Sequence, residues 1–93
     1  MTFEQESGAS MELKDTIELM TSDDYKDRFR AEYWQTKIRY DKLHKLHKML
    51  VRYDAGTLSF EPTNISLLRE QAAAMWNYLY YLEIRAEVEK IEL

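Results

Sequence analysis

Basic and aromatic side chains alternate through the middle third of this 93-residue chain. Residues 25–53 carry nine lysines and arginines against three acidic residues, a net charge of +6. The interleaved aromatic residues are Tyr25, Tyr33, Trp34 and Tyr40. Guanidinium groups bind phosphate through paired hydrogen bonds, and aromatic rings stack on nucleobases. The mixture favours a nucleotide ligand. The alternative is that this basic segment only complements acidic segments, within or between chains.

Acidic segments flank this basic stretch on both sides. Residues 1–24 contain one lysine and seven acidic residues (net −6), and residues 54–93 contain three basic and seven acidic residues (net −4). The whole chain carries a net charge of −4, which opposes binding to the polyanionic backbone of duplex DNA. We therefore expect no duplex nucleic acid as a partner.

The sequence lacks the residue patterns on which most catalytic sites depend. It has no glycine-rich phosphate loop, no nucleophile with a base beside it and no acidic pair in an apolar setting. The absence of cysteine excludes disulfides and thiolate zinc sites. His44 and His47 could touch one metal ion, but no further ligand has suitable spacing, and a packed, hydrogen-bonded His47 is the favoured interpretation. We expect no catalytic residue, no metal, no cofactor and no enzymatic activity.

A long helix should position the basic residues. Ser22 is predicted as its N-cap, with Asp23 and Asp24 in the first turn, where the helix dipole favours negative charge. The apolar stripe, at alternating steps of four and three, comprises Phe29, Tyr33, Thr36, Tyr40, Leu43, His47 and Leu50. We expect the helix to end near Gly56, which can adopt the left-handed conformation.

A second long helix is predicted after Pro62, with Thr63 or Asn64 as its cap. Its stripe comprises Leu68, Ala72, Met75, Leu79, Leu82 and Ala86. Two such helices joined by a short connection pack antiparallel. The rest of the second helix is also covered by aromatic residues, namely Trp76, Tyr78, Tyr80 and Tyr81. A helix that is apolar nearly all round is buried on more than one side, which predicts a homo-oligomer.

The predicted fold class is all-α, a long antiparallel helical hairpin with a short N-terminal helix, assembled as a homo-oligomer. Residues 1–22 are expected to form an N-terminal tail that could include the short helix, and residues 23–93 the helical hairpin domain. Ser10 would cap the short helix, and Leu13, Ile17 and Met20 would line one of its faces. No apolar run approaches the roughly 20 residues of a membrane span, and the N-terminus lacks a signal pattern. We expect a cytoplasmic protein without a membrane partner.

Two segments resemble a known family, YKDRFRAEYWQTKIRYDKLHKLHKML (residues 25–50) and LLREQAAAMWNYLYYLEIRAEVE (residues 67–89). The matching positions are Arg28, Glu32, Lys37, Leu43 and Leu50 in the first helix, and Leu67, Leu68, Gln71, Met75, Tyr78, Leu79, Leu82 and Arg85 in the second. Their order and spacing resemble the hairpin domain shared by the phage anti-CBASS and anti-Thoeris sponges, which sequester cyclic-nucleotide immune signals. The resemblance covers residues 23–92.

The resemblance implies a helical homo-oligomer, typically a hexamer, that binds its ligand without hydrolysis. Ligands would be cyclic dinucleotides, cyclic trinucleotides or ADP-ribose-type signals, held between subunits by arginine, lysine, tyrosine and backbone groups. Anti-Thoeris members carry an extra C-terminal portion, whereas this chain ends at Leu93, which favours cyclic oligonucleotides. Arg28, Lys37 and Arg85 match the motif positions, and the resemblance implies a binding role for them.

The hairpin should bring the start of the first helix and the end of the second together at its open end. The free backbone N–H groups at the start of a helix can also bind phosphate. The expected ligand-binding residues are Tyr25, Lys26, Arg28, Arg30, Lys37, Tyr81 and Arg85. An alternative position for the site lies along Lys37, Arg39 and Tyr40.

The sequence thus predicts a phage anti-defence sponge that binds and sequesters cyclic oligonucleotide immune signals without cleaving them, in the cytoplasm of the infected bacterial host cell. The alternative is a helical protein–protein interaction or assembly module with no nucleotide ligand. An enzyme that cleaves such signals is a third hypothesis, which fits the residues least well.

Overall fold

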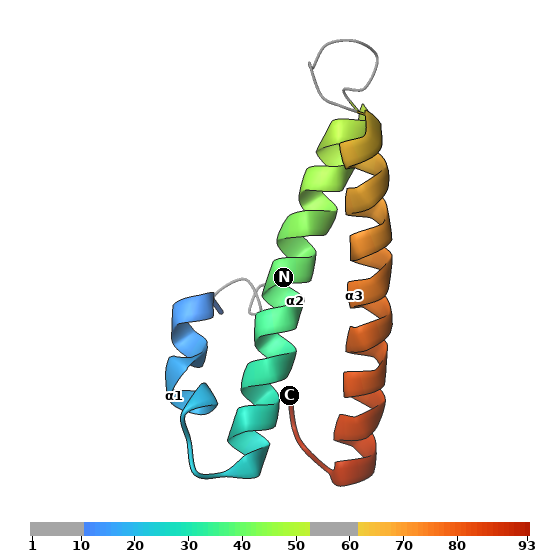
Figure 1. Ribbon diagram of the computed structural model, residues 1–93. Coiled ribbons are helices and arrows are strands. Elements are labelled where there is room, and N and C mark those ends of the chain that lie inside the picture. The colour runs from blue at the N-terminus through green and yellow to red at the C-terminus, as the bar shows by residue number, and fades with distance from the viewer. Residues whose placement is uncertain (1–10, 53–61) are drawn as a thin grey trace, which may run out of the picture.

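Helices account for all the regular secondary structure in the described part of the chain. The computed structural model describes residues 11–52 and 62–93. The elements are the 3₁₀ helix η2 (Leu13–Thr16) and the α-helices α1 (Ile17–Met20), α2 (Tyr25–Arg52) and α3 (Pro62–Glu89). Helices α2 and α3 run antiparallel, side by side, and the short helix α1 lies on the other side of α2 (Figure 1). The predicted all-α class is confirmed.

The core lies between α2 and α3. Phe29 and Tyr33 of α2 pack there with Leu79, Leu82 and Ala86 of α3. Leu82 is 1% exposed, and burying a leucine side chain contributes about 1.5–3 kcal/mol. Every residue of the two predicted apolar stripes is buried or half-buried. The periodicity therefore identified the correct face of each long helix.

The N-cap of helix α2 lies two residues later than predicted. Asp24 is the capping residue, because its Oδ1 atom accepts the N–H of Lys26 at 3.0 Å and its carbonyl accepts the N–H of Arg28 at 3.2 Å. Ser22 supports this cap, since its hydroxyl accepts the N–H of Asp24 at 3.0 Å and donates to the Asp27 carboxylate at 2.8 Å. The prediction of Ser22 as the N-cap was wrong, because a serine and an aspartate two residues apart are both good caps.

Helix α3 begins at Pro62, so Thr63 and Asn64 lie inside the helix rather than capping it. Proline suits the first helical position, because its fixed φ is helical and its missing N–H would have no partner there. The predicted cap at Ser10 and the predicted helix end near Gly56 lie outside the described residues.

The short N-terminal helices contact α2 through Thr16, which is 1% exposed. Its hydroxyl donates to the carbonyl of Leu13 at 2.7 Å and accepts from the Gln35 amide at 2.9 Å. Ile17 and Met20, by contrast, are 54% and 47% exposed, so the predicted packing face was wrong for these two residues. The physical reason is the 3₁₀ turn, which has three residues per turn instead of 3.6 and therefore rotates the buried face.

Helix α3 ends in a left-handed residue, Lys90, with φ of 59°. The N–H of Lys90 bonds to the carbonyl of Glu87 at 3.3 Å, and the N–H of Ile91 bonds to that of Ala86 at 2.8 Å. These two bonds form a Schellman motif, which usually has glycine at the left-handed position. The turn folds Ile91 back into the core, where it is 5% exposed.

In residues 11–52 and 62–93, no helix combines the length and the apolarity needed to cross a membrane.

Candidate ligand-binding site

The open end of the hairpin joins Tyr25 of α2 to Arg85 and Glu89 of α3. The Tyr25 hydroxyl donates to Glu89 Oε1 at 2.8 Å and accepts from Arg85 Nη2 at 2.7 Å. Arg85 Nε also donates to Glu89 Oε2 at 3.2 Å. The guanidinium carbon of Arg85 lies 4.9 Å from the centre of the Phe29 ring. We call these three residues, Tyr25, Arg85 and Glu89, the open-end triad.

The hydrogen bonds within this triad shift the pKa values of all three side chains. The hydrogen bond to Glu89 raises the pKa of Tyr25 and also that of Arg85. The hydrogen bond from Tyr25 lowers the pKa of Glu89. The guanidinium of Arg85 already holds a carboxylate, so a phosphate that binds it competes with Glu89.

Two other predicted residues at this end, Arg28 and Arg30, are also engaged within the chain. Arg28 Nη1 donates to the carbonyl of Ser22 at 2.8 Å. Arg30 bonds to Asp27 Oδ1 at 3.0 Å and to the carbonyl of Glu92 at 2.6 Å. These contacts direct two of the predicted cations toward groups of the same chain.

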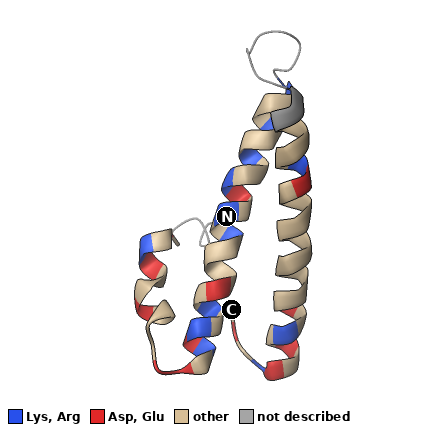
Figure 2. Ribbon diagram, viewed as in Figure 1, with Lys and Arg blue, Asp and Glu red and all other residues tan. Residues whose placement is uncertain are grey.

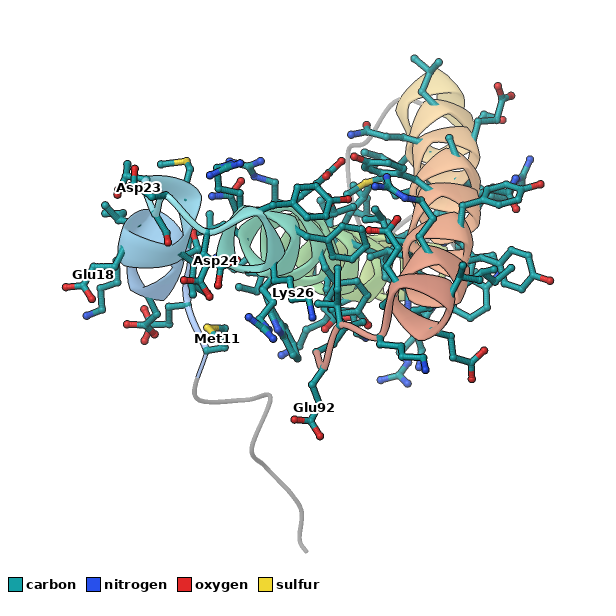
Figure 3. The ribbon with its side chains drawn as sticks, turned by 90° about the horizontal axis from the view of Figure 1, so that it is seen from below. Met11, Glu18, Asp23, Asp24, Lys26 and Glu92 are labelled. Carbon is teal, nitrogen blue, oxygen red and sulfur yellow. The ribbon has the colours of Figure 1, made fainter. Side chains whose placement is uncertain are left out.

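Acidic and basic residues are mixed at the open end. Figure 2 shows both kinds of charge near the lower ends of α2 and α3. Figure 3, which looks at this end from below, shows Asp24 beside the start of α2 and Asp23 nearer to α1, with Lys26 and Glu92 on another side. The start of α2 is itself capped by the Asp24 carboxylate, which reduces its attraction for an external anion.

Of the two remaining predicted residues, Tyr81 precedes Arg85 by one helical turn, and Lys37 lies farther along α2. The Tyr81 ring is 62% exposed and packs against Tyr80, with their centres 5.4 Å apart. Lys37 lies near the middle of α2 and forms an ion pair with Asp41 at 3.1 Å. The seven predicted residues are therefore spread over several parts of the surface rather than gathered in one pocket.

Lys37 borders a hollow between α2 and α3. This hollow has a volume of about 50 Å³, and it is lined by Lys37, Tyr40, Trp76, Leu79, Tyr80 and Glu83. A second hollow of about 260 Å³ is lined by Tyr40, His44, His47, Arg69, Ala72, Ala73 and Trp76. Tyr40 and Trp76 belong to both, so the two hollows adjoin. We call them together the aromatic groove.

Aromatic rings form the middle of this groove. The rings of Tyr40 and Trp76 lie 6.0 Å apart and are tilted by 43°. His44 stacks on Tyr40 at 5.5 Å with an angle of 18° between the rings. Trp76 and Tyr80 are 59% and 54% exposed, which leaves large aromatic surfaces open to solvent.

One edge of the groove carries a carboxylate. Glu83 Oε2 accepts the hydroxyl of Tyr33 at 2.9 Å. Burial and this hydrogen bond raise the pKa of Tyr33, so its hydroxyl stays protonated and keeps donating to Glu83.

His47 lies at the other end of the groove. It is half-buried, but its Nε2 atom is buried without a hydrogen-bond partner among the described residues. The expectation of a hydrogen-bonded His47 was therefore wrong for this nitrogen. No group of three His, Asp or Glu residues in the described ranges is arranged to hold a metal ion.

The sequence analysis did not assign Arg69, Trp76 or Glu83 to a ligand site. Their signal was present, because Trp76, Tyr80 and Glu83 follow a four-three spacing that places them on one flank of α3. Lys37, Tyr40 and His44 have the corresponding spacing on α2. Only the register between the helices shows that these two flanks face one another.

The side of α3 that points away from α2 is a separate apolar surface. Tyr81, Ile84 and Val88 form a row with three-four spacing and are 62%, 39% and 75% exposed. We call these three residues the outer row. Nothing in the described part of the chain covers them.

Comparison with known proteins gives a match to one family. The family model described as Sequestin matches residues 23–88, a range that includes all of α2 and all but the last residue of α3. No curated protein and no solved structure matches the chain. The match confirms the resemblance to the phage sponges that the residues of the two helices indicated, and it points to a sequestering family rather than to a family of enzymes.

Proposed function

Because the chain belongs to the Sequestin family, we propose that it is a phage anti-defence sponge for cyclic oligonucleotide immune signals. The ligands would be cyclic dinucleotides or cyclic trinucleotides, bound without cleavage. The observation that carries this proposal is the family match over the whole hairpin, residues 23–88. The cations and aromatic side chains of α2 and α3 supply the chemistry that such a ligand needs.

A sponge acts by mass action. It lowers the free concentration of a signal when its binding sites outnumber the signal molecules and its Kd lies below that of the effector protein. No bond in the ligand has to break. The function therefore requires hydrogen-bond donors and aromatic surfaces for stacking, but no nucleophile or general base. The expected place of action is the cytoplasm of the infected bacterial cell.

The proposed ligand contacts include the predicted residues Tyr25, Lys26, Arg28, Arg30, Lys37, Tyr81 and Arg85. Arg85 would exchange the Glu89 carboxylate for a phosphate, which its guanidinium can bind through two hydrogen bonds. Arg85 and Trp76 are nine residues apart, which at 3.6 residues per turn places them on opposite sides of α3. A ligand that touches both must therefore lie between two copies of the chain.

We also propose that copies of the chain associate through the outer row, with a hexamer implied by the family resemblance. The exposed side chains of Tyr81, Ile84 and Val88 support this proposal, because exposed apolar surface of this kind is stabilised by burial against a partner. The same surface supports the second candidate function, a protein–protein interaction module without a nucleotide ligand.

A ligand screen separates the two functions. The purified protein is heated with individual cyclic di- and trinucleotides, and its melting temperature is compared with that of the protein alone. A ligand that binds only the folded state raises the melting temperature, and for the sponge it is recovered chemically intact by chromatography after heating. An unchanged melting temperature with every cyclic nucleotide would favour the interaction module, and recovery of cleaved ligand would favour an enzyme.

A further inference from the structure

The aromatic groove combines three features that suit a nucleotide. Its middle exposes the ring of Trp76, with Tyr80 beside it. Its two ends each carry a cation, Lys37 at one and Arg69 at the other. The groove thus offers a flat apolar surface flanked by positive charge.

Resting on the proposed function, we propose that the aromatic groove binds one nucleotide unit of the cyclic ligand. The base stacks on Trp76, and the phosphates on either side of that unit lie toward Lys37 and Arg69. Each nucleotide in a cyclic oligonucleotide has a phosphate on both sides, so a cation at each end of the groove matches its charge pattern. The base itself is uncharged and suits the aromatic centre.

The size of the groove fits one unit rather than a whole cyclic ligand. Its larger hollow, about 260 Å³, lies close to the lower limit of roughly 300 Å³ for ligand pockets. Lys37 and His44 are seven residues apart, which is about 10 Å along the axis of α2. The remaining units of the ligand would project out of the groove.

Polar groups at the two ends favour a nucleotide over an apolar peptide. His47 lines the larger hollow, and its buried Nε2 atom has no hydrogen-bond partner among the described residues. Glu83 lies at the other end and can accept a hydrogen bond from an amino group of the base. Asp41 partly offsets the charge of Lys37 through their ion pair, so stacking and Arg69 carry most of the binding.

The fluorescence of Trp76 can report whether a ligand binds in the groove. The Trp34→Phe variant leaves Trp76 as the single tryptophan, since the chain contains two. Titration with cyclic diadenylate and cyclic triadenylate should quench its fluorescence, because a stacked base contacts the indole directly. The Trp76→Ala variant should bind roughly 5- to 150-fold more weakly, the range expected for losing one base–aromatic stack.

Matched variants separate the groove from the rest of α3. Leu67 is also an exposed apolar residue, but it is nine residues from Trp76 and so lies on the opposite side of the helix, about 27 Å along the axis from Arg85. Leu67→Ala should keep the parent affinity, whereas Arg69→Gln should bind about tenfold more weakly. Arg69 is exposed, so its substitution tests the groove even where the Trp76 variant fails to fold.

The possible results distinguish the two proposals. Parent affinity in both the Trp76→Ala and Arg69→Gln variants, or unquenched Trp76 emission on a protein that binds the ligand, would overturn the groove and leave the sponge function intact. Failure of the parent protein to bind any cyclic di- or trinucleotide would overturn the sponge function and the groove together.

Discussion

Arg85 donates a hydrogen bond of 2.7 Å to the hydroxyl of Tyr25, a residue 60 positions earlier in the chain. The contact joins the end of α3 to the start of α2 and, with Glu89, closes the open end of the hairpin. It therefore fixes the two helices relative to one another at the point farthest from their connection.

The open-end triad should make stability depend on pH. The pKa of Glu89 is lowered from 4.5, so its contribution is fully present above pH 4.5 and is lost as the pH falls through the lowered value. The pKa of Tyr25 is raised from 10.0, so its contribution is present below pH 10.0 and is lost as the pH rises through the raised value. The Glu89→Gln variant should therefore melt below the parent between these limits, and the difference should disappear in acid.

Melting curves at several pH values and low salt check this expectation, since salt screens exposed charges. Glu87→Gln is the matched control, because Glu87 is an exposed carboxylate two residues away. A difference between Glu89→Gln and the parent that persists unchanged at acid pH would contradict the proposed role of the ionised carboxylate.

Truncating Leu82 should destabilise the hairpin strongly. This side chain is 1% exposed at the centre of the α2–α3 core, so Leu82→Ala both loses apolar burial and leaves a cavity. We expect a loss of about 2–5 kcal/mol in the free energy of unfolding, measured by urea titration followed by circular dichroism. Leu67→Ala, at a position that is 62% exposed, should cost far less, and equal losses in both variants would contradict the assigned core.

Replacing Lys90 by glycine should stabilise the protein. Lys90 has a φ of 59°, a conformation that costs a residue with a side chain about 1–2 kcal/mol, whereas glycine adopts it freely. Glycine also raises the conformational entropy of the unfolded chain, which offsets part of this stabilisation. We therefore expect a net increase of about 0.5–1 kcal/mol in the free energy of unfolding. Urea titration of Lys90→Gly measures the change, and Lys90→Ala should bring no comparable gain.

A charge in the outer row should disrupt association of the chains. Val88 is 75% exposed in the single chain, so Val88→Glu should fold normally by itself but place an unpaired charge in a contact between copies. Light scattering after size exclusion should show several subunits for the parent and fewer for this variant. Ile17→Glu, on the far side of α2 and 54% exposed, should leave the assembly unchanged. A parent protein that elutes as a monomer of 11.2 kDa would rule out the proposed association.

Substituting Arg85 tests the open end as a place for phosphate. Arg85→Ala should weaken binding of cyclic dinucleotides by about ten- to a hundredfold, the loss expected for one charge-assisted hydrogen-bonded contact. Titration calorimetry measures the affinity, and light scattering checks that the assembly persists. Arg28→Ala is the companion variant, and unchanged affinity in both would place the phosphate contacts elsewhere.

The long helices could be predicted because their residues repeat with one consistent period. Phe29, Tyr33, Leu79 and Leu82 are buried where the spacing indicated, since packing and helix geometry demand the same faces. The N-terminal helices were less predictable, because the 3₁₀ turn before Ile17 changes the period within a few residues. The cap of α2 was ambiguous for a related reason, as Ser22 and Asp24 have similar capping ability.

The candidate site was harder to predict than the fold. Contact between Tyr25 and Arg85 follows from the topology of a hairpin, which brings its first and last turns together. The partners of Arg28 and Arg30 could not be predicted from the sequence. They are the backbone carbonyls of Ser22 and Glu92, and every residue has such a carbonyl, so residue type does not indicate which one accepts the hydrogen bond. The meeting of Tyr40 with Trp76 depends on the relative register of two helices, which the periodicity of each helix alone does not determine.

Helix α3 presents its aromatic groove and its outer row on different sides, and this separation has a consequence for how such a chain can change over generations. A substitution at Trp76 or Arg69 alters the surface that would recognise the signal without touching Val88 or Ile84. A substitution at Val88 or Ile84 does the reverse, whereas Tyr81 belongs to both proposed surfaces. Under the proposed function, a host that changes its signalling molecule therefore selects for substitutions at Trp76 or Arg69, and these leave the proposed self-association contacts of Val88 and Ile84 unaltered.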